Sequence, residues 1–349
     1  MADTDGRLKV LVVDDAVVPR GMIRQWLEED ADAAVQTAAN GRQALDKLKT
    51  FAADVITLDL EMPVLSGYEA LPLIRQTSPN SQIVVVSGAS RRAGSVTFDA
   101  LRRGAADFVA KQDRENRSAF RREIVEKVKT LGSLKRKPVA AAPVADAPAP
   151  RPRRTADITL KRSVVAIGSS TGGPQALADL LAGLGGRLTV PVLISQHLPV
   201  NFSKVFAQNL SRKTGLDCVE ATDGEPLISG RVYIAPGDRH MMVAQSGAGA
   251  TIRLWDGPRE HHCRPAVNPL FRSVAEVYGR RAMAIVLTGM GSDGAEGAET
   301  IAAAGGIVAV QDQATSIVWG MPGATFNRGV ADAVLPVPDI AKLIREHCK

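Results

Sequence analysis

A proline- and alanine-rich segment in the middle of the chain most limits what the chain can fold into. Of the fifteen residues from Pro138 to Pro152, five are proline and six are alanine, and the segment shows no apolar periodicity. Such a segment cannot bury enough apolar surface to offset its ordering entropy, and it favours semi-extended polyproline-II conformations. The sequence therefore predicts two folded domains, over residues 6–130 and 162–349, joined by a flexible linker over residues 131–161.

The excess positive charge of the chain lies in the same region. The formal net charge is +6, and residues 132–162 carry 8 basic and 2 acidic side chains. Residues 1–131 carry 19 basic and 19 acidic side chains, and residues 163–349 carry 16 of each. Because neither predicted domain is basic, the composition does not indicate a nucleic-acid-binding face, and no nucleic-acid partner is expected.

Membrane insertion is also not expected. No apolar stretch approaches the roughly 20 residues that a membrane-spanning helix needs. The N-terminal stretch MADTDGRLKV is polar and shows no signal-peptide pattern. The three cysteines are widely spaced, which favours reduced thiols and a cytoplasmic location.

Short apolar runs alternate with helical patterns in both predicted domains. This alternation predicts a parallel, doubly wound sheet in the first domain and a larger, mainly parallel α/β sheet in the second. The expected strands are Lys9–Val13, Ala33–Thr37, Val55–Leu58, Ile83–Val86 and Phe108–Ala110, then Ser163–Ile167, Val190–Ser195, Arg231–Ala235, Ala282–Leu287 and Ile307–Val310.

Polar side chains follow the predicted strands of the first domain, namely Asp14, Asp15, Asp59, Ser87 and Lys111. The carboxyl ends of parallel strands meet at one edge of a sheet, so three carboxylates would converge there and favour Mg²⁺. An aspartate beside that cation can act as a nucleophile toward phosphorus. A lysine and a hydroxyl can then hold the phosphoryl oxygens. An aspartate pair alone more often caps a helix, so the prediction depends on the whole set.

The same set resembles the receiver domain of bacterial response regulators, over roughly residues 6–130. The resemblance implies a flavodoxin-like (βα)5 fold in which Asp59 is the phospho-acceptor. It further implies that Asp14 and Asp15 hold Mg²⁺ together with Asp59, and that a histidine kinase is the phosphodonor.

Three further roles come from this resemblance. Ser87 would ligate the phosphoryl group, Lys111 would pair with it, and Phe108 would reorient on activation. One position departs from the family pattern, because Gln112 follows the lysine where the family usually has proline. This departure leaves the loop geometry near Lys111 open, although the charge of the lysine is kept.

The segment GSSTGG, from Gly168 to Gly173, joins a predicted strand to a predicted helix. The glycine spacing fits a Walker-type phosphate loop, but Pro174 and Gln175 stand where that loop needs lysine and a hydroxyl. A nucleotide-dependent transferase is therefore a distant alternative. The segment also matches G-x-S-x-G, with Ser170 at the centre of a nucleophile elbow. A helix-capping cluster of hydroxyl side chains remains open for this motif alone.

A serine nucleophile needs a base and an acid that orients the base. His197 follows one predicted strand and Asp293 follows another, so both are expected at the same edge of the sheet as Ser170. The glycine-rich run Gly289–Gly294 offers backbone N–H groups that suit an oxyanion hole. Cys263 is an alternative nucleophile or zinc ligand, which the absence of a second cysteine nearby disfavours.

Five segments, IGSSTGGPQAL, QHLP, YIAPGDRHM, LTGMGSDGA and WGMPGA, look like the catalytic domain of chemotaxis protein-glutamate methylesterases. By this resemblance Ser170 is the nucleophile, His197 the base and Asp293 the orienting acid. The backbone near Thr171 and Met290 would line the oxyanion site. The segment CRPAVNPLF matches less closely, because its second proline interrupts a stretch that usually continues without one.

The two resemblances together imply a hydrolase regulated by phosphorylation. Its substrates would be γ-glutamyl methyl esters on the cytoplasmic regions of methyl-accepting chemoreceptors, with glutamine deamidation as a second activity. The esterase reaction would need no cofactor. The receiver domain would contact the catalytic domain within the chain and inhibit it until Asp59 is phosphorylated. The alternative is a phospho-switched scaffold protein whose esterase domain is degenerate.

Overall fold

The structure is a computed structural model that describes residues 6–88, 90–111, 117–136, 160–186, 188–247 and 249–348. The chain divides into two compact units, one within residues 1–145 and the other within residues 146–349. Gln112 and most of the expected linker lie outside the described residues. No helix in the described ranges is long and apolar enough to span a membrane.

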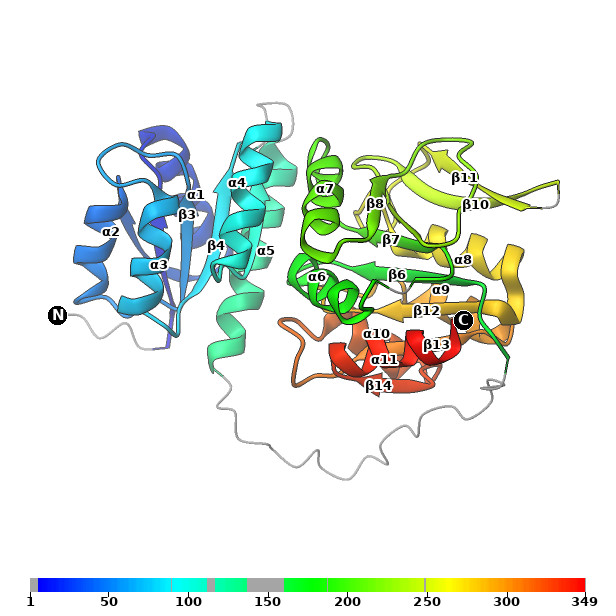
Figure 1. The fold of residues 1–349 in the computed structure, drawn as a ribbon. Helices are drawn as coiled ribbons and strands as arrows, with labels where there is room; N and C mark the ends of the chain where they lie inside the picture. The colour runs from blue at the N-terminus through cyan, green and yellow to red at the C-terminus, as the bar shows by residue number, and fades with distance from the viewer. Residues whose placement is uncertain are drawn as a thin grey trace, which may run out of the picture. The chain divides into compact units, whose positions relative to one another are not determined.

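The first unit is a five-stranded parallel sheet in the order β2-β1-β3-β4-β5. Helices α1 and α5 pack together, and α2, α3 and α4 form a second group (Figure 1). The elements are β1 (Leu8–Val13), α1 (Val17–Asp30), β2 (Ala33–Ala38), α2 (Gly41–Leu48), β3 (Val55–Asp59), α3 (Gly67–Thr77), β4 (Gln82–Ser87), α4 (Arg91–Arg102), β5 (Asp107–Ala110) and α5 (Arg117–Arg136).

Local sequence explains why these elements begin where they do. All five residues of β3 are buried, as expected for a strand that is covered on both faces. Helix α3 begins with a capping box, in which the side chains of Ser66 and Glu69 each accept a backbone N–H of the other residue. The strand order places β1 and β3 side by side at the point where the chain changes direction across the sheet. In such sheets ligands bind beyond the strand ends at this switch point.

The second unit is built on a seven-stranded parallel sheet in the order β14-β13-β12-β6-β7-β9-β8. The elements are β6 (Val164–Ser169), α6 (Gly173–Gly183), β7 (Val192–Gln196), α7 (Phe202–Thr214), β8 (Asp217–Glu220), β9 (Arg231–Ile234), β10 (His240–Ser246), β11 (Gly249–Trp255), α8 (Val267–Tyr278), β12 (Ala282–Val286), α9 (Ala295–Ala303), β13 (Ile307–Gln311), α10 (Gly320–Asn327), β14 (Ala333–Leu335) and α11 (Val337–His347), with a short 3-10 turn at Gly279–Arg281.

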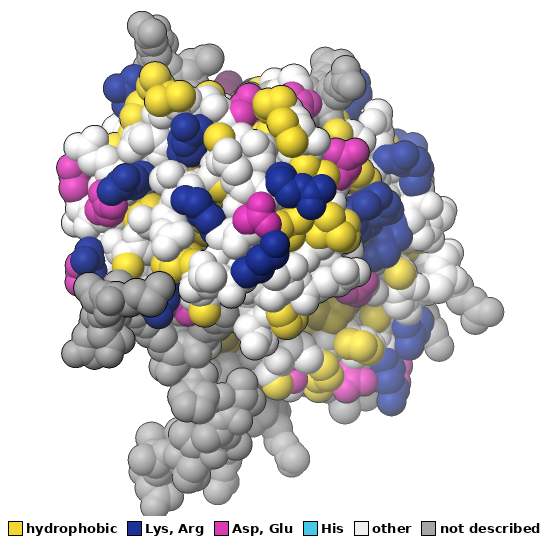
Figure 2. All heavy atoms as spheres, turned by 90° about the vertical axis from the view of Figure 1, so that its left-hand side faces the viewer, with side chains coloured by type: hydrophobic (Ala, Val, Ile, Leu, Met, Phe, Trp, Pro, Cys, Tyr) yellow, Lys and Arg dark blue, Asp and Glu magenta, His cyan; other side chains and the backbone are white. Residues whose placement is uncertain are grey.

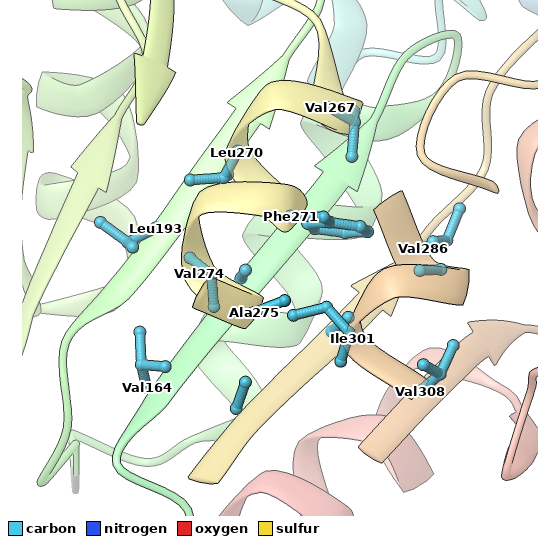
Figure 3. Packing of buried hydrophobic residues seen from close by; sticks show 14 of the residues in the cluster. Val164, Leu193, Val267, Leu270, Phe271, Val274, Ala275, Val286, Ile301 and Val308 are labelled. Atoms are coloured by element: carbon cyan, nitrogen blue, oxygen red, sulfur yellow. The ribbon is translucent and has the colours of Figure 1, made fainter. Parts of the chain in front are cut away.

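Helices cover both faces of this second sheet. Helices α6, α7 and α11 lie on one face, and α8 and α9 lie on the other (Figure 1). An antiparallel hairpin, β10–β11, packs beside α8. Figure 3 shows the core between α8, α9 and the sheet, whose labelled side chains are Val164, Leu193, Val267, Leu270, Phe271, Val274, Ala275, Val286, Ile301 and Val308.

The second sheet also has a switch point. From β6 the chain proceeds to β7, β8 and β9 on one side, and it then returns to β12, β13 and β14 on the other side. The ends of β6, β7 and β12 therefore meet at the centre of the carboxyl edge. This is where an α/β sheet of this kind places its functional groups.

The α/β class expected for both domains is confirmed, and each expected strand is present within two residues of its expected bounds. The sequence analysis did not include β8, β10, β11 and β14. On the molecular face shown in Figure 2, Lys and Arg side chains are interspersed with Asp and Glu, with no extended area of one sign.

Candidate active site

Three carboxylates meet at the switch point of the first unit. Asp14 follows β1 and Asp59 ends β3, and ligand oxygens of Asp14, Asp15 and Asp59 all lie within 4.8 Å of one another. Asp14 and Asp59 are almost fully buried, whereas Asp15 is exposed. An all-oxygen donor set of this kind fits Mg²⁺, which prefers carboxylates and keeps several waters. The expected cluster is thus assembled, and its chemistry suits the expected cation.

Lys111 neutralises this cluster. Its Nζ lies 2.5 Å from Oδ2 of Asp59 and 2.9 Å from Oδ2 of Asp14. Burial raises the pKa of the Asp59 carboxyl above its ordinary value, although the nearby Lys111 works in the opposite direction. Burial would lower the pKa of Lys111, but the two aspartates outweigh it and raise that pKa. Lys111 is therefore held in its charged form beside Asp59.

Ser87 and Phe108 are the other two residues predicted for this site. Ser87 lies at the edge of the sheet, whereas Phe108 lies within a strand. Ser87 is buried at the end of β4, and its carbonyl oxygen accepts the Lys111 backbone N–H at 2.7 Å. Phe108 lies within β5 and is buried in an edge-to-face contact with Phe98, with 5.9 Å between ring centroids. Ser87 thus reaches the strand edge near Lys111, whereas the Phe108 ring is part of the packing against α4.

Ser170, His197 and Asp293 form a hydrogen-bonded chain in the second unit. His197 Nδ1 lies 3.1 Å from Ser170 Oγ, and His197 Nε2 lies 2.8 Å from Asp293 Oδ2. Ser170 directly follows β6, His197 directly follows β7, and Asp293 lies in the loop after β12. An ionised Asp293 accepts a hydrogen bond from Nε2–H, so in the neutral imidazole the lone pair lies on Nδ1 and faces the serine hydroxyl. This arrangement suits a serine whose proton is taken by a histidine.

Asp293 is fixed by backbone donors at the start of α8. Its Oδ2 accepts the Val267 N–H at 2.6 Å, and its Oδ1 accepts the Asn268 N–H at 3.1 Å. Burial alone would raise the pKa of Asp293, but its hydrogen bonds to His197 and to the two N–H groups lower that pKa below its ordinary value. The carboxylate is therefore both ionised and held in one orientation.

Cys263 is the unexpected neighbour of the triad. Its Sγ lies 3.4 Å from His197 Nδ1, the same nitrogen that faces Ser170. Burial would lower the pKa of His197, but Cys263 and Asp293 outweigh burial and raise it to about 10. Sequence reasoning disfavoured Cys263 as a functional residue, and no local signal indicated its proximity to the base.

The turn that carries Ser170 depends on close packing. Ser169 is fully buried and donates its Oγ–H to Gln196 Oε1 at 2.7 Å, while Gln196 Nε2 donates to the Ser170 carbonyl at 3.0 Å. Gly172 adopts a φ of 76°, which favours glycine. A Cβ on Gly173 would lie 2.0 Å from Gln196 Oε1. The absence of a side chain at Gly173 therefore makes room for the Gln196 side chain.

The oxyanion donors predicted from the sequence lie on two loops beside Ser170. The Ser170 N–H itself is used, because it donates to the Thr288 carbonyl at 3.1 Å. Thr171 is the next residue, and no hydrogen-bond partner is found for its N–H within the described ranges. Met290 lies in the loop after β12, next to Gly289, on which a Cβ would lie 2.9 Å from the Ser170 Cβ. Both predicted donors are thus on segments that border the nucleophile.

Three further residues, His240, Trp255 and Pro269, contribute to the packing of the fold. His240 begins β10 and is fully buried. Its Nδ1 accepts the Ala266 N–H at 3.1 Å, and its Nε2 donates to the Pro258 carbonyl at 2.9 Å. The Trp255 ring packs on the His240 ring. Pro269 lies in the first turn of α8, where the missing N–H of proline costs no helical hydrogen bond.

Comparisons with known proteins follow the same division of the chain. Residues 10–119 match the response regulator receiver domain family, and residues 165–344 match the CheB methylesterase family. The chain is 41% identical to the protein-glutamate methylesterase/protein-glutamine glutaminase of group 2 operon from Rhodospirillum centenum, over 97% of this chain and 93% of that protein. It is 43% identical to protein-glutamate methylesterase/protein-glutamine glutaminase 2 from Caulobacter vibrioides, over 98% of this chain and 99% of that protein.

A solved structure supports the fold of the second unit. The catalytic domain of the Thermotoga maritima CheB methylesterase is 38% identical, with a TM-score of 0.52, and it covers 53% of this chain and 98% of that domain. Fold and comparisons together define a response regulator whose receiver domain precedes a hydrolase domain of the α/β class. The chain belongs to the protein-glutamate methylesterase/protein-glutamine glutaminase family, and it is a hydrolase.

Proposed function

We propose that this protein hydrolyses γ-glutamyl methyl esters on the cytoplasmic regions of chemoreceptors and deamidates glutamine side chains there. The observation that carries the proposal is the hydrogen-bonded chain Ser170–His197–Asp293 at the carboxyl edge of the second sheet. The names of the relatives, which specify glutamate methyl esters and glutamine as substrates, support the same substrate class. A cytoplasmic location is proposed with it, because the receptor regions concerned are cytoplasmic.

The reaction begins with an attack by Ser170 Oγ on the ester carbonyl carbon, as His197 Nδ1 takes the hydroxyl proton. The charge that forms on the carbonyl oxygen is stabilised by backbone N–H groups, for which Thr171 and Met290 are the candidates. Asp293 accepts the Nε2–H throughout and stabilises the imidazolium. His197 then gives its proton to the methoxy oxygen, so that methanol leaves and a glutamyl ester of Ser170 remains.

Water completes the cycle. His197 removes a proton from the water as its oxygen attacks the acyl carbon, and the bond to Ser170 Oγ breaks as that oxygen regains a proton. The product is a glutamate side chain. A glutamine side chain presents the same acyl carbon with ammonia as the leaving group, so the same residues serve for deamidation. This sequence of steps requires no cofactor.

Regulation is proposed to reside in the receiver domain. A carboxylate oxygen of Asp59 attacks the phosphorus of a phosphohistidine on a kinase, and the bond from phosphorus to the histidine nitrogen breaks. Mg²⁺ held by Asp14, Asp15 and Asp59 would neutralise the carboxylates and the phosphoryl oxygens. Lys111 and Ser87 would hold the transferred group. Phosphorylation would then weaken an inhibitory contact of the receiver with the catalytic domain within the chain.

The test is methanol release from methylated receptor membranes, with and without a small-molecule phosphodonor. Ser170→Ala is expected to lower the release at least about a thousandfold. Ser246→Ala, which changes an exposed serine of β10, is the matched control and should retain wild-type release. Equal release by the wild type and Ser170→Ala would contradict the assignment of the nucleophile. No release by either would favour the scaffold alternative.

A further inference from the structure

A two-residue turn beside the triad holds two histidines in the left-handed region. The Cys263 N–H donates to the Glu260 carbonyl at 2.8 Å, and the Glu260 N–H donates to the Cys263 carbonyl at 3.2 Å. Between them, His261 has a φ of 50° and His262 a φ of 64°. Positive φ at both central positions is the pattern of a type I′ turn, which favours Asn-Gly. Two histidines there are less favourable for stability than the Asn-Gly pair.

Ion pairs hold the base of this turn in place. The Glu260 carboxylate accepts a hydrogen bond from Arg272 at 3.0 Å. The Asp238 carboxylate pairs with Arg259 at 2.6 Å and with Arg264 at 3.0 Å. These charged groups are paired at the base of the turn, and His261 and His262 occupy its two central positions.

The turn touches the active site at two points. Cys263, its last residue, has its Sγ 3.4 Å from Nδ1 of the base His197. His261 has its Nδ1 3.5 Å from Oγ of Ser292, the residue that precedes the orienting aspartate. Both histidines of the turn are exposed, and no hydrogen bond or ion pair is found for the His262 side chain in the described ranges. The turn therefore lies beside the Ser170 site, with His261 and His262 exposed at its tip.

We propose that His261 and His262 contact the substrate protein and contribute to its recognition. The inference rests on the proposed function, in which the substrate is a receptor segment that carries glutamyl esters and, after hydrolysis, glutamate carboxylates. Imidazole N–H groups can donate to these ester, carbonyl and carboxylate oxygens. Contacts remote from the reacting carbonyl strengthen binding of the whole substrate, so they act mainly on KM. A small ester that ends near the scissile bond would not reach the turn.

The test replaces His261 and His262 with Asn-Gly, the pair that type I′ turns favour. In the full chain, the double variant His261→Asn/His262→Gly should melt at the same temperature or higher, because the left-handed strain is relieved. We expect the KM for methylated receptor membranes to rise about fivefold to tenfold, with kcat changed by less than about twofold. The kcat/KM for p-nitrophenyl acetate, a small soluble ester, should change by less than about twofold.

The control is Asp32→Gly, which relieves a positive φ of 45° in the receiver unit. This variant should leave unchanged both the KM for methylated receptor membranes and the kcat/KM for p-nitrophenyl acetate. An unchanged receptor KM in the turn variant would overturn this inference and leave the proposed function intact. An equal loss on both esters would also overturn it, since the turn would then act through the triad. A wild-type protein that cleaves the small ester but releases no methanol from receptors would overturn the proposed function and this inference together.

Discussion

Gly289 lies nearer to the nucleophile than any side chain would allow. A Cβ at this position would lie 2.9 Å from the Ser170 Cβ and 2.3 Å from the Met321 Sδ. We therefore expect Gly289→Ala to displace Ser170 relative to His197 and to lower kcat by about ten- to a hundredfold, because such reactions are sensitive to misplacement of about 1 Å. Steady-state hydrolysis of a small ester measures the effect.

The matched control for that substitution is Gly21→Ala. Gly21 lies in α1, where an added Cβ would meet no atom within 4 Å. Esterase activity should be unchanged, and the free energy of unfolding should rise by about 0.5–1 kcal/mol, because alanine is the better helix former. If Gly289→Ala keeps the wild-type kcat, the turn around Ser170 can accommodate the added Cβ without displacing Ser170, and the prediction is wrong.

Cys263 sets the pH dependence of the base. Burial would lower the pKa of His197, but Cys263 and Asp293 raise it to about 10. Because Cys263 is one of the two residues that raise the pKa of His197, Cys263→Ala is expected to lower that pKa. His197 must be unprotonated at Nδ1 to accept the serine proton. The rising limb of kcat against pH should therefore move to lower pH.

The pH profile of small-ester hydrolysis tests this shift, with Cys218→Ala as the control. Burial raises the pKa of the Cys218 thiol to about 12, and this cysteine lies on β8 rather than beside the base. The rising limb should keep its wild-type position in Cys218→Ala. If the limb stays in place in Cys263→Ala as well, the sulfur does not stabilise the imidazolium and the assigned cause is wrong.

At the scale of elements, the start of α8 holds Asp293, the proposed catalytic acid, in place. Asn268 is fully buried, and its Oδ1 accepts the N–H groups of Gly294 at 3.0 Å and Gly297 at 2.8 Å. Its own N–H donates to Asp293. Asn268 therefore joins α8, α9 and the loop that carries the acid.

Asn268→Ala leaves two buried backbone N–H groups without their acceptor. We expect the unfolding free energy of the second unit to fall by about 2–3 kcal/mol, since each unsatisfied buried donor costs about 1–3 kcal/mol. The kcat should fall as well, because Asp293 loses its fixed surroundings. Chemical denaturation and small-ester kinetics measure the two effects. Glu276→Ala, at an exposed position of the same helix, should change neither quantity.

Elements also show what the sequence could predict. Strand β12 is a short apolar run, and β3 is a mainly apolar run that ends in Asp59. The rule that parallel strand ends share one edge of the sheet predicted the positions of Asp59, Ser170 and Asp293. The β10–β11 hairpin was missed, although Met241 and Val243 alternate with polar or less buried residues and a glycine turn follows. Its pattern is a local alternation with a turn, which differs from the strand–helix alternation on which the strand predictions rest.

The residues that support the triad were less accessible to sequence reasoning. Gln196 and Asn268 act by hydrogen bonds to backbone groups far away in the chain, and Cys263 approaches His197 across 66 positions. None of these contacts follows from periodicity or from the spacing of a motif. They depend on how α8 packs across β6, where a Cβ on Gly168 would lie 2.3 Å from Val267 (Figure 3).

At the scale of the whole molecule, the two units follow the same architectural rule. Each is a parallel sheet whose functional groups lie where the strand order changes direction, at β1 and β3 in the first unit and at β6 and β12 in the second. The chemistry at the two edges differs. The first edge gathers carboxylates and a lysine, and the second gathers a serine, a histidine and one aspartate. A reagent that acts on one edge can therefore separate the two functions.

A magnesium chelator is such a reagent. Within the described residues, Asp14, Asp15 and Asp59 form the one group of acidic, histidine or cysteine side chains arranged to hold a metal ion. Removal of Mg²⁺ from the full chain should abolish the stimulation of methanol release by a phosphodonor. Release without the phosphodonor should stay within about twofold of its starting rate, because the nucleophile, base and acid of the esterase are side chains.

Asp59→Ala in the same assay identifies the step that the metal serves. This variant should keep its basal release, should not respond to the phosphodonor, and should be insensitive to the chelator, because it has lost both the phospho-acceptor and one metal ligand. A chelator that lowers basal release equally in the wild type and in Asp59→Ala would place a metal requirement in the esterase reaction itself. A full response of Asp59→Ala to the phosphodonor would mean that the switch lies at another residue. The expected pattern, loss of stimulation with basal release retained, assigns magnesium and phosphorylation to the same edge of the first sheet.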